Sequence, residues 1–280
     1  MNVLVVGAGK VGRALALRLR EAGASVSVVR ARSVARRKGF GADLLIVAAA
    51  DPWVARVART IVDRLEAAPR ALRPAAVVHV AGGLGLEALD AFRSVSIPVG
   101  QMHPLLSFAG APPALDGATM RVDGDPGAIR AAREVARLLG MVARRFERLP
   151  PAAYHAAAAL VANGAVGLVG AAASALALHG VPRDVAARMF GRLLASVAEN
   201  VSGLGLPAAL TGPVRRGDAA AIERHLAHLD GSVKLYRAVV TAQLGMAREL
   251  GEATESALDR IEELVRANPK KDPRRRKRPG

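Results

Sequence analysis

Three glycines near the start of the chain have the spacing of a turn that binds phosphate groups. Residues 7–12 read Gly-Ala-Gly-Lys-Val-Gly and directly follow the apolar run 3–6. In this pattern the first glycine permits a tight turn, the second lets the backbone approach a pyrophosphate, and the third lets a helix pack on the strand. The N-terminus of that helix offers free N–H groups to phosphates. We therefore predict a dinucleotide-binding turn formed by Gly7, Gly9, Lys10, Val11 and Gly12. The alternative is a tight strand–helix turn that binds nothing.

The residues after the next apolar run distinguish between two nicotinamide dinucleotides. Proteins that bind NAD place Asp or Glu there to hold the ribose 2′-OH, whereas arginine accommodates the 2′-phosphate of NADP. Here the sequence continues from Val29 as Arg30-Ala31-Arg32-Ser33, without a carboxylate. Because a guanidinium suits bidentate contact with phosphate, this segment predicts NADP, although arginine is abundant throughout the chain. The predicted cofactor contacts beyond the glycine turn are Arg30, Arg32, Ser33, Ala49 and Asp51.

Two histidines could transfer the proton that accompanies hydride transfer to or from a nicotinamide. Imidazole titrates near neutrality and suits general acid–base catalysis. His103 is the first candidate and His155 the second, and Asn163 is expected to orient a small-molecule substrate. His155 and Asn163 are eight residues apart on one predicted helix, so they lie about 80° apart around its axis. The alternatives are that His103 only shapes a loop and that His155 only lies in an interface.

The elements that would position these side chains alternate between strand and helix in the first half of the chain. Apolar, β-branched runs predict strands at 1–6, 25–29, 44–48, 76–80, 95–99, 118–122 and 142–146. Helical patterns lie between them, including 52–65 and 126–139. This alternation predicts an α/β fold with a parallel, doubly wound sheet of the Rossmann type. Ligands of such sheets bind outside the carboxyl ends of the strands, so His103, placed after the fifth strand, is expected to line the cleft.

Beyond residue 150 the pattern is helical only. The sequence thus predicts a Rossmann dinucleotide-binding domain at 1–150, an all-α substrate and dimerisation domain at 151–267, and a disordered basic tail at 268–280. Residues 156–178 carry no charge, and a helix of that length could span a membrane. Eleven of these 23 residues are Ala and three are Gly, which instead favours close helix packing. We expect this helix to be buried in a bundle or in a homodimer interface, with no membrane span.

The overall composition excludes several other functions. The 280 residues include 40 Lys and Arg against 24 Asp and Glu, but only 3% are aromatic. The stacking surfaces of many nucleic-acid binders are therefore missing, and nucleic acid is not expected as a partner. The absence of cysteine excludes thiol catalysis and Cys-ligated metals. His225 and His228 lack a carboxylate motif, so no metal site is predicted. The N-terminus does not resemble a signal peptide, and a cytoplasmic location is expected.

Five segments resemble those of known Rossmann-type proteins. They are VVGAGKVG at 5–12, VVHVAGG at 77–83, HPLLSF at 103–108, YHAAAALVAN at 154–163 and LTGPVRRGD at 210–218. Together they resemble bacterial proteins that pair a Rossmann-like domain with a C-terminal helical domain of unknown function. More distantly, the chain is similar to pyrroline-5-carboxylate reductases, prephenate dehydrogenases and β-hydroxyacid dehydrogenases. The resemblance implies an NADP-type reductase fold whose helical domain commonly dimerises. The lysine of β-hydroxyacid dehydrogenases has no counterpart beside Asn163.

These features together predict an NADP-dependent oxidoreductase. It would transfer a hydride between NADP(H) and a small carbonyl, imine or hydroxy compound. The alternative is a non-enzymatic NADP(H)-binding protein that reports redox state or acts through partners.

Overall fold

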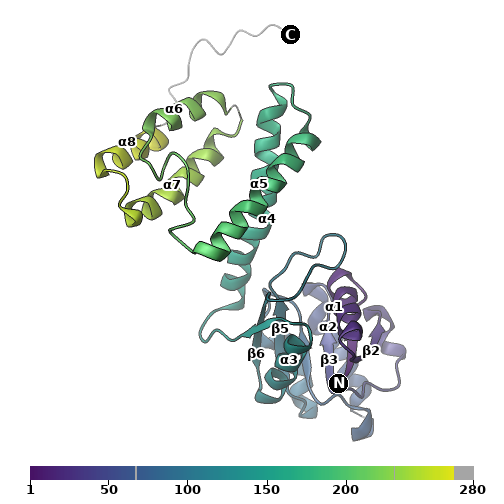
Figure 1. The fold of residues 1–280 in the computed structure, drawn as a ribbon. Coiled ribbons are helices and arrows are strands. Elements are labelled where there is room, and N and C mark those ends of the chain that lie inside the picture. Colours follow the sequence, from purple (N-terminus) through teal and green to yellow (C-terminus); the bar gives the residue numbers. More distant parts are fainter. Residues whose placement is uncertain (67, 230, 268–280) are drawn as a thin grey trace. The chain divides into compact units, whose positions relative to one another are not determined.

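The computed structural model (Figure 1) describes residues 1–66, 68–229 and 231–267. These residues divide into two compact units, the first at Met1–Ala162 and the second from Asn163 onward. The helix-only part of the chain begins at Pro151, the first residue of α4 (Pro151–Ala177), and the first half of α4 belongs to the first unit. The predicted basic tail at 268–280 lies outside the described residues.

A seven-stranded sheet forms the centre of the first unit. Its strands are β1 (Asn2–Val6), β2 (Ser25–Val29), β3 (Leu44–Val47), β4 (Val77–His79), β5 (Val99–Pro104), β6 (Thr119–Gly124) and β7 (Val142–Arg144). Their order across the sheet is β2-β1-β3-β4-β5-β6-β7. The longer helices of this unit besides α4 are α1 (Lys10–Glu21), α2 (Val54–Leu65) and α3 (Pro126–Leu138). Its short 3-10 helices are η1 (Ala31–Arg36), η2 (Asp51–Trp53), η3 (Arg70–Leu72) and η4 (Leu86–Val95).

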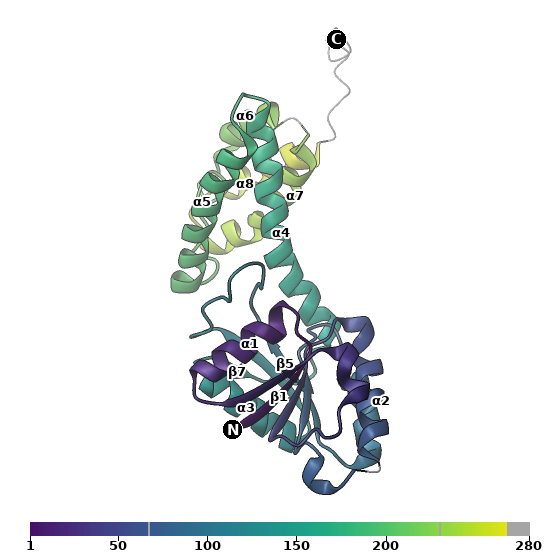
Figure 2. The same cartoon turned by 90° about the vertical axis from the view of Figure 1, so that its right-hand side faces the viewer.

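Apolar side chains cover both faces of this sheet. On one face α1 and α3 pack through residues such as Leu15 and Val135. On the other face α2 and η4 pack through residues such as Ile61 and Phe92. Figure 2 shows α1 and α3 on one side of the strands and α2 on the other. Because both faces are covered, a central strand such as β3 is apolar and buried at every position. The predicted doubly wound α/β fold is confirmed.

Two predictions about the strands are wrong. The run 95–99 does not form the fifth strand, because η4 continues to Val95 and Ser96 has a φ of 54°. β5 begins only at Val99, so His103 lies within this strand instead of after it. The sheet is also not wholly parallel, since β6 pairs with β5 in antiparallel orientation. Residues 105–118 contain no helix, and a parallel neighbour would need such a crossover.

The second unit is helical. It contains the rest of α4, then α5 (Arg183–Leu204), α6 (Ala219–His228), α7 (Val233–Leu250) and α8 (Glu255–Arg266). The last three helices share a small apolar core that includes Ile222, Leu244 and Ile261. α6 begins at a capped end, where the Asp218 carboxylate accepts a hydrogen bond from the Ala221 N–H at 2.9 Å.

Large parts of α4 are not covered by the chain's own residues. Leu160, Val161 and Val166 are 76%, 73% and 72% exposed. By length and composition α4 could cross a membrane, with a mean hydropathy of 1.8 in its most apolar stretch, of which 6% is buried. The expectation that this helix is buried in a bundle of its own chain is therefore wrong for the described residues. Its small side chains leave too little volume to fill such a core.

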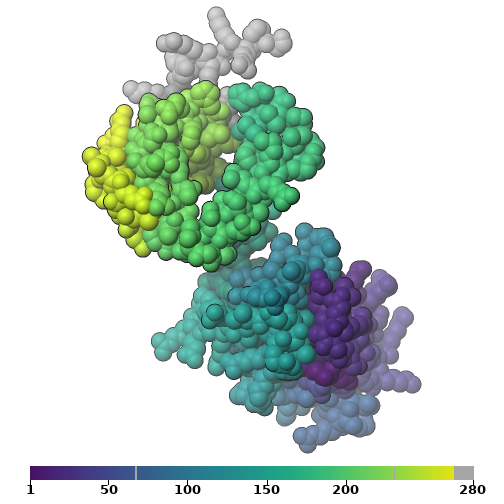
Figure 3. All heavy atoms as spheres, in the orientation of Figure 1, coloured from purple at the N-terminus to yellow at the C-terminus, as the bar shows by residue number. Residues whose placement is uncertain are grey.

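An apolar stripe also runs along α5. Exposed large side chains recur on this helix at Met189, Leu193, Val197, Val201 and Leu204. Their spacing of three and four residues places them on one face of the helix. Atoms of α5 form part of the surface of the second unit in Figure 3.

Candidate functional site

A groove of about 1000 Å³ lies at the carboxyl ends of β1 and β3. The helices that follow these two strands, α1 and α2, pack on opposite faces of the sheet. The two strands thus form the switch point at which doubly wound sheets bind ligands. The groove is lined by the glycine turn, by residues at the end of β2 and by residues after β3, including Gly7, Gly9, Arg13, Arg30, Arg32, Ala49 and Trp53.

The glycine turn fits the backbone of a dinucleotide. Gly7 has a φ of 130°, and a Cβ there would lie 2.2 Å from the carbonyl oxygen of Ala48. A Cβ on Gly12 would lie 2.0 Å from the carbonyl oxygen of Gly7. In contrast, a Cβ on Gly9 would meet nothing within 4 Å, and α1 begins directly after it without a side-chain cap. The free N–H groups at the start of α1 therefore border open space, as a pyrophosphate site requires.

Arginines surround the rest of the groove. Arg30 follows β2 and Arg32 lies in η1, and both side chains are exposed. Arg13 donates from Nε to the carbonyl oxygen of Ala8, which holds its guanidinium beside the glycine turn. No carboxylate is among the described residues that line the groove. The donor set therefore fits a polyphosphate ligand.

Two imidazoles converge near the carboxyl ends of β4 and β5. Nδ1 of His103 is 3.2 Å from the hydroxyl oxygen of Tyr154. The rings of His103 and His155 meet edge to face, with centroids 5.8 Å apart. A Cβ on Gly82 would lie 2.7 Å from Nε2 of His103 and 2.6 Å from Nδ1 of His155. The two nitrogens therefore face the same stretch of backbone, and only glycine leaves room between them.

Two buried side chains hold the loop after β4 that contains this glycine. Gln101 donates from Nε2 to the carbonyl oxygens of Ala81 and Leu84 at 2.7 and 3.0 Å. Nε2 of His79 is 3.1 Å from the carbonyl oxygen of Gly85. Gln101 and His79 are 1% and 0% exposed. Hydrogen bonds at such depth fix a loop firmly, so the backbone opposite the imidazoles is preorganised.

Burial disfavours the protonated forms of His103 and His79. Burial, followed by the charges of His155 and Arg121, lowers the pKa of His103 to about 4. Burial also lowers the pKa of His79. The carboxylate of Asp51 opposes both changes because it favours the protonated rings. At neutral pH His103 is therefore an uncharged imidazole, which can form hydrogen bonds but does not carry the extra proton of an imidazolium acid.

The structure brings some of the predicted site residues together. Those that line the groove are Gly7, Gly9, Arg30, Arg32 and Ala49, and those that do not are Lys10, Val11, Gly12, Ser33 and Asp51. His103 and His155 meet in one cluster, whereas Asn163 is exposed and belongs to the second unit. The functional roles of all these residues stay predictions. Among the described residues no group of three or more His, Asp or Glu side chains could hold a metal ion.

The sequence analysis missed Arg13 and Arg121 as members of the two clusters, and it did not place Tyr154 beside His103. Arg13 stands one residue after the last glycine of the turn, and a cation there is a readable signal of phosphate binding. Tyr154 directly precedes His155 in the sequence and contacts His103. Arg121 is 1% exposed and stands between the buried apolar residues Met120 and Val122 of β6. A single charge in a buried strand position was the signal that could have revealed it.

Comparisons with known proteins agree with this architecture. Residues 118–243 match the model of a family described as a domain of unknown function (DUF2520). The chain is similar to a crystal structure of a protein from Thermotoga maritima, with 22% identity and a TM-score of 0.66 over 89% of this chain and 99% of that chain. It is also similar to pyrroline carboxylate reductase from Plasmodium falciparum with NADP bound, with 12% identity and a TM-score of 0.57 over 90% and 97% of the two chains.

A third similar structure is an imine reductase from Myxococcus stipitatus in complex with NADP+. The identity is 14% and the TM-score 0.52, over 95% of this chain and 93% of that chain. The curated proteins include no match. This chain thus combines a Rossmann-type α/β unit with a C-terminal helical region, a fold that it shares with these solved structures.

Proposed function

We propose that this protein is an NADP(H)-dependent oxidoreductase that acts on a small carbonyl, imine or hydroxy compound. The observation that carries the proposal is the position of two clusters on one edge of the sheet. The arginine-lined groove lies at β1 and β3, and the imidazole pair lies at the neighbouring strands β4 and β5. Neighbouring strands are about 4.8 Å apart, so a dinucleotide that starts in the groove can extend toward the imidazoles.

Different residues of the groove would bind the two phosphate-containing parts of the cofactor. The N–H groups at the start of α1 would bind the pyrophosphate, with Arg13 as an additional cation beside the turn. Arg30 and Arg32 would bind the 2′-phosphate, because a guanidinium matches the oxygens of a phosphate in pairs. Trp53 lines the same groove. When bound, NADP(H) supplies or accepts the hydride.

The imidazole pair would bind the polar atom of the substrate. His103 is uncharged at neutral pH because its pKa is about 4, so it would orient or polarise a carbonyl or imine through a hydrogen bond. His155 is exposed to solvent. In this proposal His155 thus takes over the proton transfer that the sequence analysis assigned first to His103. Asn163 is retained as a residue that orients the substrate.

The cofactor proposal can be tested without knowing the substrate. Trp53 is the only tryptophan, so NADPH should quench its fluorescence and receive energy from it. NADPH should bind at least about tenfold more tightly than NADH, because a charge-assisted hydrogen bond contributes roughly 1.5–3 kcal/mol. Arg30→Asp should remove that preference by repelling the 2′-phosphate and offering a carboxylate to the 2′-OH of NADH.

The matched control for this experiment is Arg36→Asp. Arg36 is exposed in η1 but is not among the residues that line the groove. Its replacement by Asp changes the charge by the same amount as Arg30→Asp, but outside the groove. It should leave the ratio of the two affinities unchanged. Equal affinities of the wild-type protein for NADPH and NADH would contradict the NADP assignment.

We also propose that the protein is a cytoplasmic homodimer whose helical region forms the interface. Two observations support a second copy of the chain as the partner. Residues 156–177 of α4 carry no charge, so two copies can meet there without electrostatic repulsion. Exposed apolar side chains also recur along α5, and exposed apolar surfaces mark interaction sites.

A further inference from the structure

Arg121 of β6 is a buried cation without an ion pair among the described residues. Its side chain is 1% exposed. Nη2 donates to the carbonyl oxygen of Leu149 at 2.8 Å, whereas Nε and Nη1 are buried without a hydrogen-bond partner. Removal of a guanidinium from water destabilises the fold by several kcal/mol unless charged partners compensate. An apolar side chain would suit this position better, so stability alone does not explain the arginine.

The contacts of Arg121 lead directly to the imidazole pair. In the antiparallel register of β5 and β6, Arg121 is paired with His103. Its guanidinium carbon lies 4.7 Å from the centre of the Tyr154 ring, a distance at which a cation is attracted to an aromatic face. The hydroxyl group of Tyr154 is in turn 3.2 Å from Nδ1 of His103. Arg121, Tyr154 and His103 thus form a continuous chain of contacts.

The protonated phenol of Tyr154 is able to donate the hydrogen bond that it shares with His103. Burial raises the pKa of Tyr154, so the phenol keeps its proton at neutral pH. His103 is its hydrogen-bond partner among the described residues. If the phenol donates to Nδ1, the hydrogen of the neutral imidazole must be on Nε2. That nitrogen faces Gly82 and lies on the same side as Nδ1 of His155.

The charged and titratable groups around His103 favour an uncharged ring. They are His155 and Tyr154 of α4, Arg121 of β6, His79 of β4 and Asp51 after β3. Charge on Arg121, His155 or His79 opposes protonation of His103, and only the carboxylate of Asp51 favours it. Tyr154 is uncharged and acts on His103 through the hydrogen bond between its hydroxyl group and Nδ1.

We propose that Arg121 is a positioning residue that holds the Tyr154 ring against His103, so that His103 presents a hydrogen on Nε2 to the site. The buried guanidinium thereby sets the tautomer of an imidazole that it does not itself hydrogen bond. The use of this N–H toward a substrate carbonyl or imine rests on the reductase function proposed above. The tautomer itself does not, and it can be observed directly.

The test is nitrogen NMR of the histidine side chains in the full-length protein. The two nitrogens of a neutral imidazole have distinct shifts, which identify the one that carries hydrogen. In the wild-type protein, His103 should stay in the Nε2–H form from pH 8 to pH 5. In Arg121→Met the two shifts should move toward averaged values, and the pKa of His103 should rise by about one unit because a nearby positive charge is removed.

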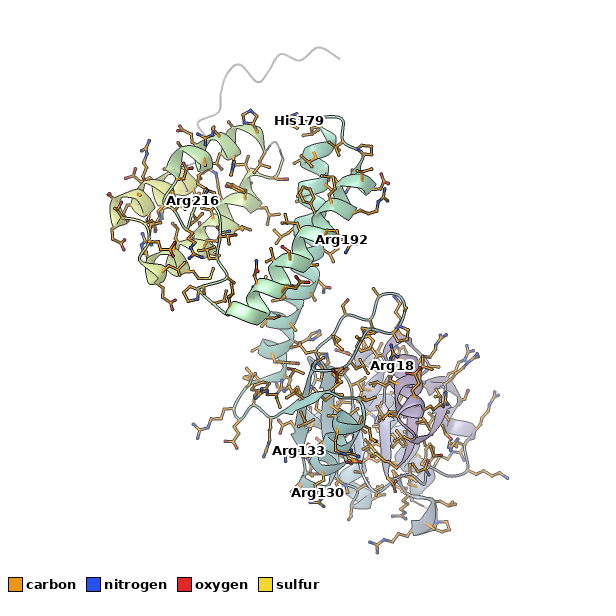
Figure 4. All side chains as sticks on the ribbon, viewed as in Figure 1. Arg18, Arg130, Arg133, His179, Arg192 and Arg216 are labelled. Carbon is orange, nitrogen blue, oxygen red and sulfur yellow. The ribbon has the colours of Figure 1, made fainter. Side chains whose placement is uncertain are left out.

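Two further variants separate positioning from a structural role. Arg133→Met removes a charge from an exposed position on α3 (Figure 4) and should leave the His103 signals unchanged. Tyr154→Phe keeps the aromatic ring but removes the hydroxyl group, and it should cause the same loss of a single tautomer as Arg121→Met. If Arg121→Met does not fold, Arg121→Lys and Tyr154→Phe decide the question, because a lysine keeps the charge but not the planar stack.

A different result would overturn the proposal. Wild-type His103 with its hydrogen on Nδ1 would contradict the direction of the hydrogen bond. Unchanged His103 signals in both Arg121→Met and Tyr154→Phe would reduce Arg121 to a structural residue. Binding of NADPH to the wild-type protein is measured in the same samples, so a failure of the reductase proposal is recognised separately.

Discussion

The two units differ in how completely each buries its own apolar surface. In the first unit both faces of the sheet are covered, and β3 is buried at every position. In the second unit α6, α7 and α8 share a small core, but Val166 of α4 and Leu193 of α5 are 72% and 58% exposed. Apolar surface of this extent is typical of a binding face. The difference indicates that the sheet and the helices that cover it bury their own apolar surface, whereas α4 and α5 leave apolar side chains exposed.

The units also differ in where they bury polar groups. Three polar or charged side chains are buried among the described residues, and they are His79, Gln101 and Arg121. All three belong to the first unit and lie around the loop after β4 or beside His103. Polar groups that are kept in a core against stability are expected at functional sites. The buried polar side chains are thus found in the unit that contains the sheet.

The largest effect that we expect is the loss of stability of the first unit when one methyl group is added to Gly12. In Gly12→Ala the new Cβ would lie 2.0 Å from the carbonyl oxygen of Gly7, and a backbone atom cannot yield as a side chain does. We expect a loss of about 3 kcal/mol or more in the free energy of unfolding, with loss of NADPH binding. Urea unfolding followed by Trp53 fluorescence measures the first of these.

Gly9→Ala is the matched control for the glycine turn. A Cβ on Gly9 meets nothing within 4 Å, so this variant should fold with wild-type stability. It should still lose affinity for NADPH, because the new methyl group occupies the space expected for the pyrophosphate. Wild-type NADPH affinity in Gly9→Ala would contradict the proposed position of the dinucleotide.

The second unit should be sensitive to a charge on its exposed apolar face. Leu193→Glu places a carboxylate in the middle of the α5 stripe and should convert a dimer into a monomer, since burial of an unpaired charge is strongly unfavourable. Light scattering should give about twice the mass of the 29.0 kDa chain for the wild-type protein and once that mass for the variant. Arg192→Glu, at the neighbouring exposed position labelled in Figure 4, should remain dimeric. A wild-type monomer at micromolar concentration would contradict the dimer proposal.

The features that depend on local sequence could be predicted. The glycine turn and the alternation of strands and helices follow from spacing and periodicity within short segments, and both are found in the structure. The position of β5 could not be predicted in this way. The run 95–99 contains β-branched residues, but η4 extends to Val95, and tertiary packing of Phe92 outweighs local strand preference.

The protonation state of His103 could not be predicted from the sequence for a related reason. Without a structure, a histidine is expected to have its ordinary pKa, which lies near neutrality. For this reason the sequence analysis predicted that His103 is a proton donor. The structure adds burial, the positive charge of Arg121 and the hydroxyl group of Tyr154. These neighbours come from β6 and α4, at sequence distances that no local motif covers. The site's residues could therefore be located approximately from sequence, but not their protonation.

The lowered pKa values of His103 and His79 predict how stability depends on pH. The pKa of His103 is about 4 in the folded protein, compared with 6.5 for an ordinary histidine. Between these values the unfolded chain binds more protons than the folded protein, so acid favours unfolding. The stability due to His103 is complete above about pH 6.5 and is lost as the pH falls toward 4. The pKa of His79 is lowered as well, and this histidine adds to the loss.

The loss that His103 contributes between pH 7 and pH 4 should be at most about 3 kcal/mol, since one pKa unit corresponds to about 1.4 kcal/mol. Urea unfolding at several pH values measures it, and Trp53 makes the signal specific for the first unit. His103→Gln should flatten the dependence on pH, because glutamine does not titrate. His228→Gln, which replaces an exposed histidine of the second unit, should leave it as in the wild-type protein. If His103→Gln retained the full wild-type slope, the lowered pKa of His103 would not contribute to the acid sensitivity, and the neutral state argued for this ring would be contradicted.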